Sequence, residues 1–430
     1  MPAAGSATAY DPLRPATLDE RGFELAGEPE LPWLLPAPLA AGPHHVVVSI
    51  VHDGFTHHYH VATDFGPLEV STTGLLRKRV REIEVMAALE AENVTAERVY
   101  LLSTLNAARG PVEGAAQLMF HPVRSAIDVP SGMWAYARRL AALTERDRTF
   151  HEDDYGEELI GFSDAKRQWA YRLGVDVYSE NAQLQQMLDR YAWLSLSGGL
   201  TVRLPLMAVS GPAGYALTVS GATHQLKREL RDRAPEEIRM EVRRQLTAQG
   251  VSPELARQFV AHPWYSPTRL LVIAESLSSL TGVKSPQSLI EAAIQADEPD
   301  ETYLFGRLAT MLAVYSKVEA PITELLAPDG LVMARAGSGE LVVPLYLDWA
   351  NWTEPMSLLL AAIEERVPAD VTRKRLVVSG GLSELTRQNV LAQGWEIIEG
   401  VEMTWLADID RDAWQPGEAD PNRVLPEFGR

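Results

Sequence analysis

The feature that most constrains this fold is a long apolar stretch in the middle of the chain. Between Tyr191 and Thr223 the only charged residue is Arg203. Just upstream, apolar residues recur at the spacing of an amphipathic helix: Leu184, Met187, Leu188, Tyr191 and Leu194. Pro and Gly in residues 210–214 cannot continue a helix and favour a tight reversal. We therefore predict a central helical hairpin over residues 181–230.

This hairpin has two interpretations. Residues 204–223 are charge-free over the roughly 20 residues that a membrane-spanning helix needs. Small residues would permit close helix contact in a bilayer, and they do the same inside a soluble helical core. Pro205 and the glycines near residue 211 interrupt a simple span, and both flanks are amphipathic. The soluble core is the favoured interpretation, and contact with a membrane is the alternative.

Composition limits the partners more than the fold. The 430 residues suffice for two or three domains, and 46% hydrophobic with 23% charged residues is typical of a soluble globular protein. A net charge of −19 argues against a nucleic-acid partner, which requires a basic face. Two basic stretches, residues 77–81 and 228–244, are interleaved with acids and are expected to be solvated helix faces. There is no cysteine, so disulfides and Cys-ligated zinc are excluded.

The N-terminal part is expected to contain an extended arm followed by a small sheet. Residues 1–43 contain eight prolines and are interpreted as an arm that docks through Trp33 and Leu34. Asp53-Gly54 is typical of a type I′ hairpin turn between two alternating strands. A third short strand over 68–71 and a helix over 74–92 complete this unit. The predicted apolar face of the hairpin comprises Val46, Val48, Ile50, Phe55, Tyr59 and Val61, and the opposite face comprises His45, Val47, Ser49, His58 and His60.

The rest of the chain is predicted to be a helical body over 101–320 and a small α+β domain over 321–407. Ser-Pro pairs at residues 252, 266 and 285 each place a hydroxyl cap before a proline at a helix start. The helices are expected near 235–249, 253–261, 267–281, 286–296 and 300–318. The C-terminal domain is predicted to contain a hairpin around 336–339, a helix over 353–366, and then strand, helix and strand over 374–398. An acidic tail follows over 408–430. The fold class is thus α+β and mostly helical.

The most tempting site is the histidine-rich hairpin, since six of the ten histidines lie between His44 and His60. His58 and His60 share a predicted strand face with His45 nearby, and imidazoles so placed can share a metal. That predicted face carries no Asp or Glu to support such a site. Histidine also tolerates an exposed strand face without any function. We therefore predict no metal and no cofactor.

Other motifs give no catalytic constellation. Residues 378–383 (Val-Ser-Gly-Gly-Leu-Ser) connect a predicted strand to a helix, where backbone amides can hold a phosphate, but a tight turn also requires a glycine pair. Ser338 lies between two strands, not on a nucleophile elbow. His151-Glu152 has no second histidine at metalloprotease spacing. The acid pairs at 153–154 and 364–365 are adjacent in sequence and point apart. The catalytic residues are therefore unknown, and the interpretation leans away from an enzyme.

Several segments resemble a family of uncharacterised bacterial proteins of no known activity. The likeness runs from about residue 42 to 400, and these segments carry it: 42–45, 53–59, 64–66, 75–87, 174–179, 380–383 and 394–395. The resemblance implies this order of elements and no functional residue. Many members begin with a secretion signal, which implies the cell envelope; this sequence shows no such pattern, so periplasm and cytoplasm both stay open.

The sequence therefore leaves two functions open. The first is a non-catalytic scaffold or interaction protein, envelope-associated in one version, that meets a protein partner through its apolar hairpin and exposed aromatics (Trp33, Trp264, Trp349 and Trp352). The second is a metal-binding protein or an enzyme of unrecognised type built on the histidine-rich hairpin. The absence of a nucleophile, base and orienting group in one motif favours the first.

Overall fold

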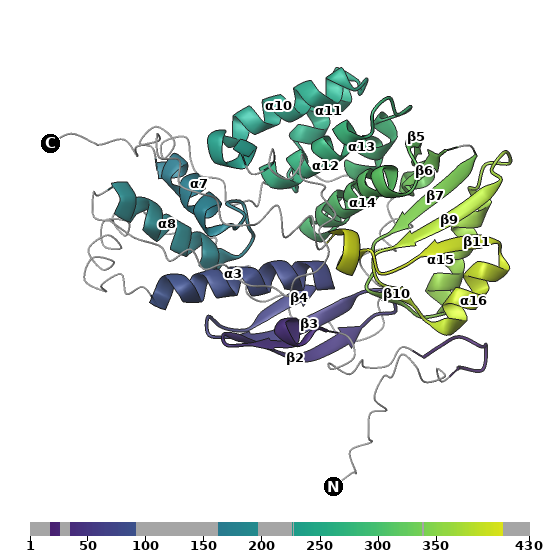
Figure 1. The fold of residues 1–430 in the computed structure, drawn as a ribbon, viewed down its shortest axis with the longest axis horizontal. Helices are drawn as coiled ribbons and strands as arrows, with labels where there is room; N and C mark the ends of the chain where they lie inside the picture. Colours follow the sequence, from purple (N-terminus) through teal and green to yellow (C-terminus); the bar gives the residue numbers. More distant parts are fainter. Residues whose placement is uncertain are drawn as a thin grey trace, which may run out of the picture.

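The fold class is confirmed by a computed structural model, which describes residues 18–25, 35–91, 162–196, 226, 228–337 and 339–406. Within these ranges the protein is α+β, with an antiparallel sheet near the N-terminus, a group of helices, and a mixed sheet near the C-terminus (Figure 1). The arm around Trp33, the turn of the central hairpin, residues 151–154, Ser338 and the acidic tail lie outside the described residues.

The N-terminal sheet has the strand order β1-β2-β3-β4 and is covered on one face by helix α3. Its elements are β1 (Ala41–Gly42), β2 (His45–His52), β3 (His57–Thr63), β4 (Leu68–Ser71) and α3 (Thr73–Ala91), with the short helix α2 (Ala37–Ala40) before β1. The inner face of α3 includes Leu76, Val80 and Ile83, which are all buried. Burial of this apolar face against the sheet is the main force that holds the unit together.

The predicted two-residue turn is wrong, and the predicted faces are reversed only in β2 before the bulge, since Ile50, Tyr59 and Val61 are buried as predicted. The connection from His52 to His57 contains four residues, so Asp53-Gly54 is not a two-residue turn. A β-bulge at Val48 shifts the register between Val47 and Ser49. One extra residue reverses which side chains face inward. Val47 and His45 are consequently buried, whereas Val46 and Val48 are exposed.

The helical body lies between the two sheets in sequence and packs around one large apolar core. Its helices are α7 (Phe162–Leu173), α8 (Ala182–Leu196), α10 (Pro235–Ala248), α11 (Pro253–Val260), α12 (Pro267–Ser279), α13 (Gln287–Ala293) and α14 (Pro299–Val318). Ser252 and Ser266 cap α11 and α12 as predicted, each accepting a hydrogen bond from the third residue on. The third pair differs, because Ser285 takes a φ of 53° and α13 begins only at Gln287.

The C-terminal unit is a five-stranded mixed sheet with the order β11-β9-β7-β6-β5. Its elements are β5 (Ile322–Leu326), β6 (Met333–Ala336), β7 (Glu340–Leu345), α15 (Glu354–Glu365), β9 (Arg373–Val378), α16 (Glu384–Ala392), β11 (Trp395–Ile398) and a π-helix, η2 (Glu402–Leu406). Strands β7, β9 and β11 run parallel, so their carboxyl ends meet at one edge. A small second pair, β8 (Trp349–Ala350) with β10 (Gly381–Leu382), lies beyond that edge.

The N-terminal sheet approaches the C-terminal sheet at this same edge, below α3 in the view of Figure 1. The main-chain N–H groups of Asp348 and Trp349 both donate to the carbonyl oxygen of Phe55, at 2.8 and 3.2 Å. Helices α10 to α14 lie on the far side of α3. Among the described residues, no helix is long and apolar enough to cross a membrane.

Candidate functional site

The histidines of the N-terminal hairpin divide between the two faces of the sheet. His58 and His60 share the outer face, as predicted, whereas His45, His52 and His57 are buried. The prediction that His45 lies near the outer pair is therefore wrong, because the bulge at Val48 places His45 on the buried face. His45 lies instead with its Nε2 3.3 Å from the carbonyl oxygen of Leu39.

Carboxylates do lie beside the outer histidines, contrary to the prediction. Asp53 Oδ2 is 3.0 Å from His58 Nε2, and Glu69 Oε1 is 3.5 Å from His60 Nδ1. The hydrogen bond to Asp53 raises the pKa of His58. Each histidine thus has its own partner, and the described residues contain no group of three or more His, Cys, Asp or Glu side chains placed to hold a metal.

The buried histidines take part in a polar junction between the two sheets. His52 Nε2 lies 3.0 Å from Asn351 Oδ1, and the His52 and His57 rings are 4.9 Å apart between centroids. Burial lowers the pKa of both rings to about 4. Both are therefore neutral near pH 7 and act as fixed hydrogen-bonding groups there.

Asp348 is the centre of this junction. It follows β7 at the carboxyl edge of the parallel strands, where open α/β sheets commonly place functional groups. Its carboxylate accepts one hydrogen bond from the main-chain N–H of His57 and one from that of Thr73, each at 2.9 Å. The second bond satisfies an amide at the start of α3. Asp348 thereby joins β3, α3 and the C-terminal sheet, and both its oxygens are occupied by the protein itself.

A second buried cluster lies beside it around Glu402, the first residue of η2. Its carboxylate accepts hydrogen bonds from Arg77 at 2.8 Å and from Arg307 at 3.0 Å. The hydroxyls of Tyr303 and Tyr346 close the cluster over Gly74, where any Cβ would collide with them. Burial raises the pKa of Tyr346 well above its usual value. The cluster ties α3, α14 and the C-terminal unit together.

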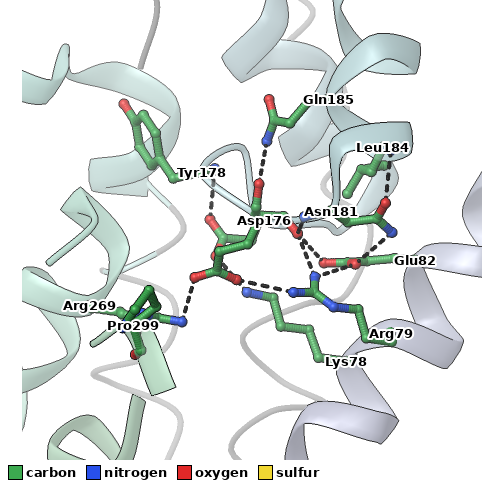
Figure 2. A network of polar contacts seen from close by, with 12 residues as sticks. Lys78, Arg79, Glu82, Asp176, Tyr178, Asn181, Leu184, Gln185, Arg269 and Pro299 are labelled. Atoms are coloured by element: carbon green, nitrogen blue, oxygen red, sulfur yellow. Dashed lines mark hydrogen bonds and ion pairs between the residues drawn. The ribbon is translucent and has the colours of Figure 1, made fainter. Parts of the chain in front are cut away.

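A third cluster gathers around Asp176, in the segment between α7 and α8 (Figure 2). Its carboxylate accepts hydrogen bonds from Lys78 at 2.9 Å, from Thr268 at 2.7 Å, and from the main-chain N–H of Tyr178 at 3.0 Å. Residues 176–179 connect α7 to α8, and all four are buried. The segment is buried because α3 and α12 both supply polar partners to it.

Lys78 and Arg79 from the basic stretch of α3 belong to the same cluster and do not form a solvated face. Arg79 binds Glu82 and the hydroxyl of Ser179, each at 2.8 Å, and it pairs with Glu180 at 3.2 Å. Glu180 also pairs with Arg269 of α12. Although burial opposes its charge, Arg269, Lys78 and Arg79 together lower the pKa of Glu180 far below its usual range. The charges are thus neutralised locally, which a buried network requires.

The two glycines of the turn at residues 378–383 lie in close contact with the segment that follows β7. A Cβ on Gly380 would collide with the carbonyl oxygen of Asp348, and one on Gly381 would lie 2.5 Å from the Trp349 ring. Ser379 donates a hydrogen bond from its hydroxyl to the Leu347 carbonyl and accepts one from the Leu347 N–H. The glycines therefore serve close packing of the turn against the β7–β8 connection.

The remaining candidates are also structural. Glu364 binds Lys374 at 2.7 Å, whereas Glu365 is exposed, so the two carboxylates do not act together. Trp264, Trp349 and Trp352, expected to be exposed, are each half-buried. The roles of Asp348, Glu402 and Asp176 were missed, because each has partners far away in the sequence. No local pattern signals such contacts.

Within the part of the chain that the structure describes, the outer side of β2 exposes several apolar side chains. Val46, Val48 and Val51 are 48%, 62% and 48% exposed. Only the first two residues of β2 pair with β1, so beyond Val46 the outer edge of the strand has no strand partner among the described residues. An exposed, apolar sheet edge is a template for pairing with another chain.

Comparison with known proteins does not assign this chain to a family. The chain matches no protein-family model, no curated protein and no solved structure.

Proposed function

We propose that this protein is a non-catalytic interaction protein that docks another polypeptide strand along the open edge of β2. The observation that carries the proposal is the combination of an unpaired edge with three exposed valines on a single strand. Strand addition at such an edge supplies main-chain hydrogen bonds, and side-chain contacts on alternate residues add specificity.

The three buried polar clusters favour a structural role for their side chains over a catalytic one. The carboxylates of Asp348, Glu402 and Asp176 all accept hydrogen bonds from groups in other elements of the same chain. Such contacts hold the N-terminal sheet, α3 and the C-terminal sheet in one arrangement. A fixed arrangement presents the β2 edge as a preformed surface, which lowers the entropic cost of docking.

The alternative of a metal-binding protein or enzyme at the histidine-rich hairpin receives less support. His58 and His60 are paired singly with Asp53 and Glu69, and His45 faces the opposite side of the sheet. A location in the cell envelope and a bacterial origin remain part of the proposal and rest on the family resemblance alone.

The proposal is tested by site-specific photo-crosslinking in the native cells. A benzophenone amino acid is placed at position 48 of the full chain, and at position 318 as the control. Val318 is 41% exposed but is the last residue of helix α14 and does not belong to a strand. We expect an adduct heavier than the 47.4 kDa chain from position 48 and none from position 318. The same adducts from both positions, or none from position 48, would refute the docking edge.

A further inference from the structure

Strand β2 has a symmetry that its partner would have to match. Its sequence reads His-Val-Val-Val-Ser-Ile-Val-His from residue 45 to residue 52. Read from either end it gives His, then Val, then a β-branched residue (Val47 or Ile50), and only the central Val48 and Ser49 differ in type. The burial of these eight residues follows the same symmetry: buried, exposed, buried, exposed and then the reverse.

This symmetry indicates which strand fits the edge. In an antiparallel pair, residues directly opposite each other point to the same face of the sheet. A partner strand must therefore present exposed residues opposite exposed ones and buried residues opposite buried ones. A second β2 meets this condition at all eight positions when the two-fold axis passes midway between the Val48–Ser49 bonds of the two strands. Closed two-fold contacts of this self-complementary kind are the commonest in soluble oligomers.

We propose that the polypeptide docked on β2 is a second copy of this chain, paired antiparallel through β2 to form one continuous sheet. The inference rests on the proposed function of the edge and names its partner. His45 then lies opposite His52 of the second copy, Val46 opposite Val51, Val47 opposite Ile50, and Val48 opposite Ser49. The bulge of each strand lies opposite the bulge of the other, so the irregularity is matched.

Two further observations favour a second copy. Residues 45–52 include no Asp, Glu, Lys or Arg, so two such strands approach without placing like charges opposite each other. The exposed valines of the two strands would form one apolar strip across the two-fold axis, in which neighbouring side chains shield part of each other's surface from water.

A second β2 that pairs with all eight residues must displace β1 from this edge, because Ala41 and Gly42 pair with Val46 and His45 there. Each subunit thus gives up two short pairings, and eight pairings form between the subunits. This exchange makes the proposal directly testable, since a lock on β1 must block the dimer.

The first test is sedimentation equilibrium of the full chain and of Val48→Lys, with Val318→Lys as the matched control on another exposed valine. We expect the wild type and the control to reach twice the 47.4 kDa of one chain, while Val48→Lys stays at a single mass with an unchanged circular dichroism spectrum. A wild type that stays monomeric up to about 100 μM, where even a weak dimer is populated, would overturn the second-copy inference.

The second test uses the absence of cysteine in the chain. Ala41→Cys with Val46→Cys joins two directly opposed residues of β1 and β2. We expect this variant to be monomeric when oxidised and dimeric when reduced. An oxidised variant that still dimerises would show that the subunits meet elsewhere. If the wild type is monomeric but position 48 crosslinks to another protein, the docking edge stands and only the identity of its partner is wrong.

Discussion

The buried pair His52 and His57 should make the stability of the protein fall with acidification. Burial, and for His52 also the neighbouring His57, lowers the pKa of each ring from 6.5 to about 4. Between these values the unfolded chain binds protons that the folded chain does not bind. The free energy of unfolding therefore holds its full value above pH 6.5 and decreases as the pH falls towards 4.

The size of this effect follows from the two pKa values. With 6.5 in the unfolded state and about 4 in the folded state, one histidine removes about 2 kcal/mol of stability between pH 7.5 and pH 5.0. His58 works in the opposite direction, because Asp53 raises its pKa. Its contribution is present below pH 6.5 and is lost as the pH rises through the raised value.

The assay is urea denaturation at pH 7.5 and pH 5.0 for the wild type, His52→Gln and His60→Gln. His52→Gln removes one buried titrating ring, so its loss of stability on acidification should be about 2 kcal/mol smaller than that of the wild type. His60 lies on the outer face of the same sheet and serves as the control for a histidine substitution. If His52→Gln shows the same pH dependence as the wild type, the buried junction does not titrate as argued.

Three substitutions test the packing. Gly54 has a φ of 101°, so Gly54→Val should cost about 1 kcal/mol or more in thermal melting, and an unchanged melting temperature would contradict the described loop. Gly381→Ala should lower the free energy of unfolding by about 1–3 kcal/mol, because the new Cβ meets the Trp349 ring. Gly306→Ala in helix α14 has room for its Cβ and should raise the free energy of unfolding by about 0.5–1 kcal/mol. Equal effects of the two substitutions would argue against the close contact at Gly381. Asp176→Ala removes a buried partner of Lys78 and should lower the free energy of unfolding by about 3–5 kcal/mol in urea denaturation. Asp370→Ala, at an exposed ion pair, is the control and should change the free energy of unfolding little.

The helices after residue 234 could be predicted because their signals are local. A serine before a proline satisfies a free amide and fixes the first φ angle, so Ser252 and Ser266 mark helix starts without tertiary help. Ser285 shows the limit of this rule. The same Ser-Pro pair there lies in a bend with positive φ, and the helix begins one residue later than predicted.

The faces of β2 could not be predicted for a different reason. Alternation identifies a buried face only when polar and apolar residues alternate, and Val46-Val47-Val48 gives no such contrast. The bulge at Val48 is a property of the pairing with β3, which the sequence of one strand does not show. The polar clusters were equally hidden, since Asp176 joins residues that are 98 and 92 positions away.

The measurement that tests the account most directly is hydrogen–deuterium exchange of the β2 amides over a range of protein concentrations, with β3 as the internal reference. An open edge that pairs with a second copy predicts that protection rises with concentration for those amides of residues 47–51 that point away from β3, while protection of residues 57–63 stays constant. Full protection of these outward amides at the lowest concentration would mean that the edge is already covered. Protection that never changes with concentration would contradict pairing with a second copy.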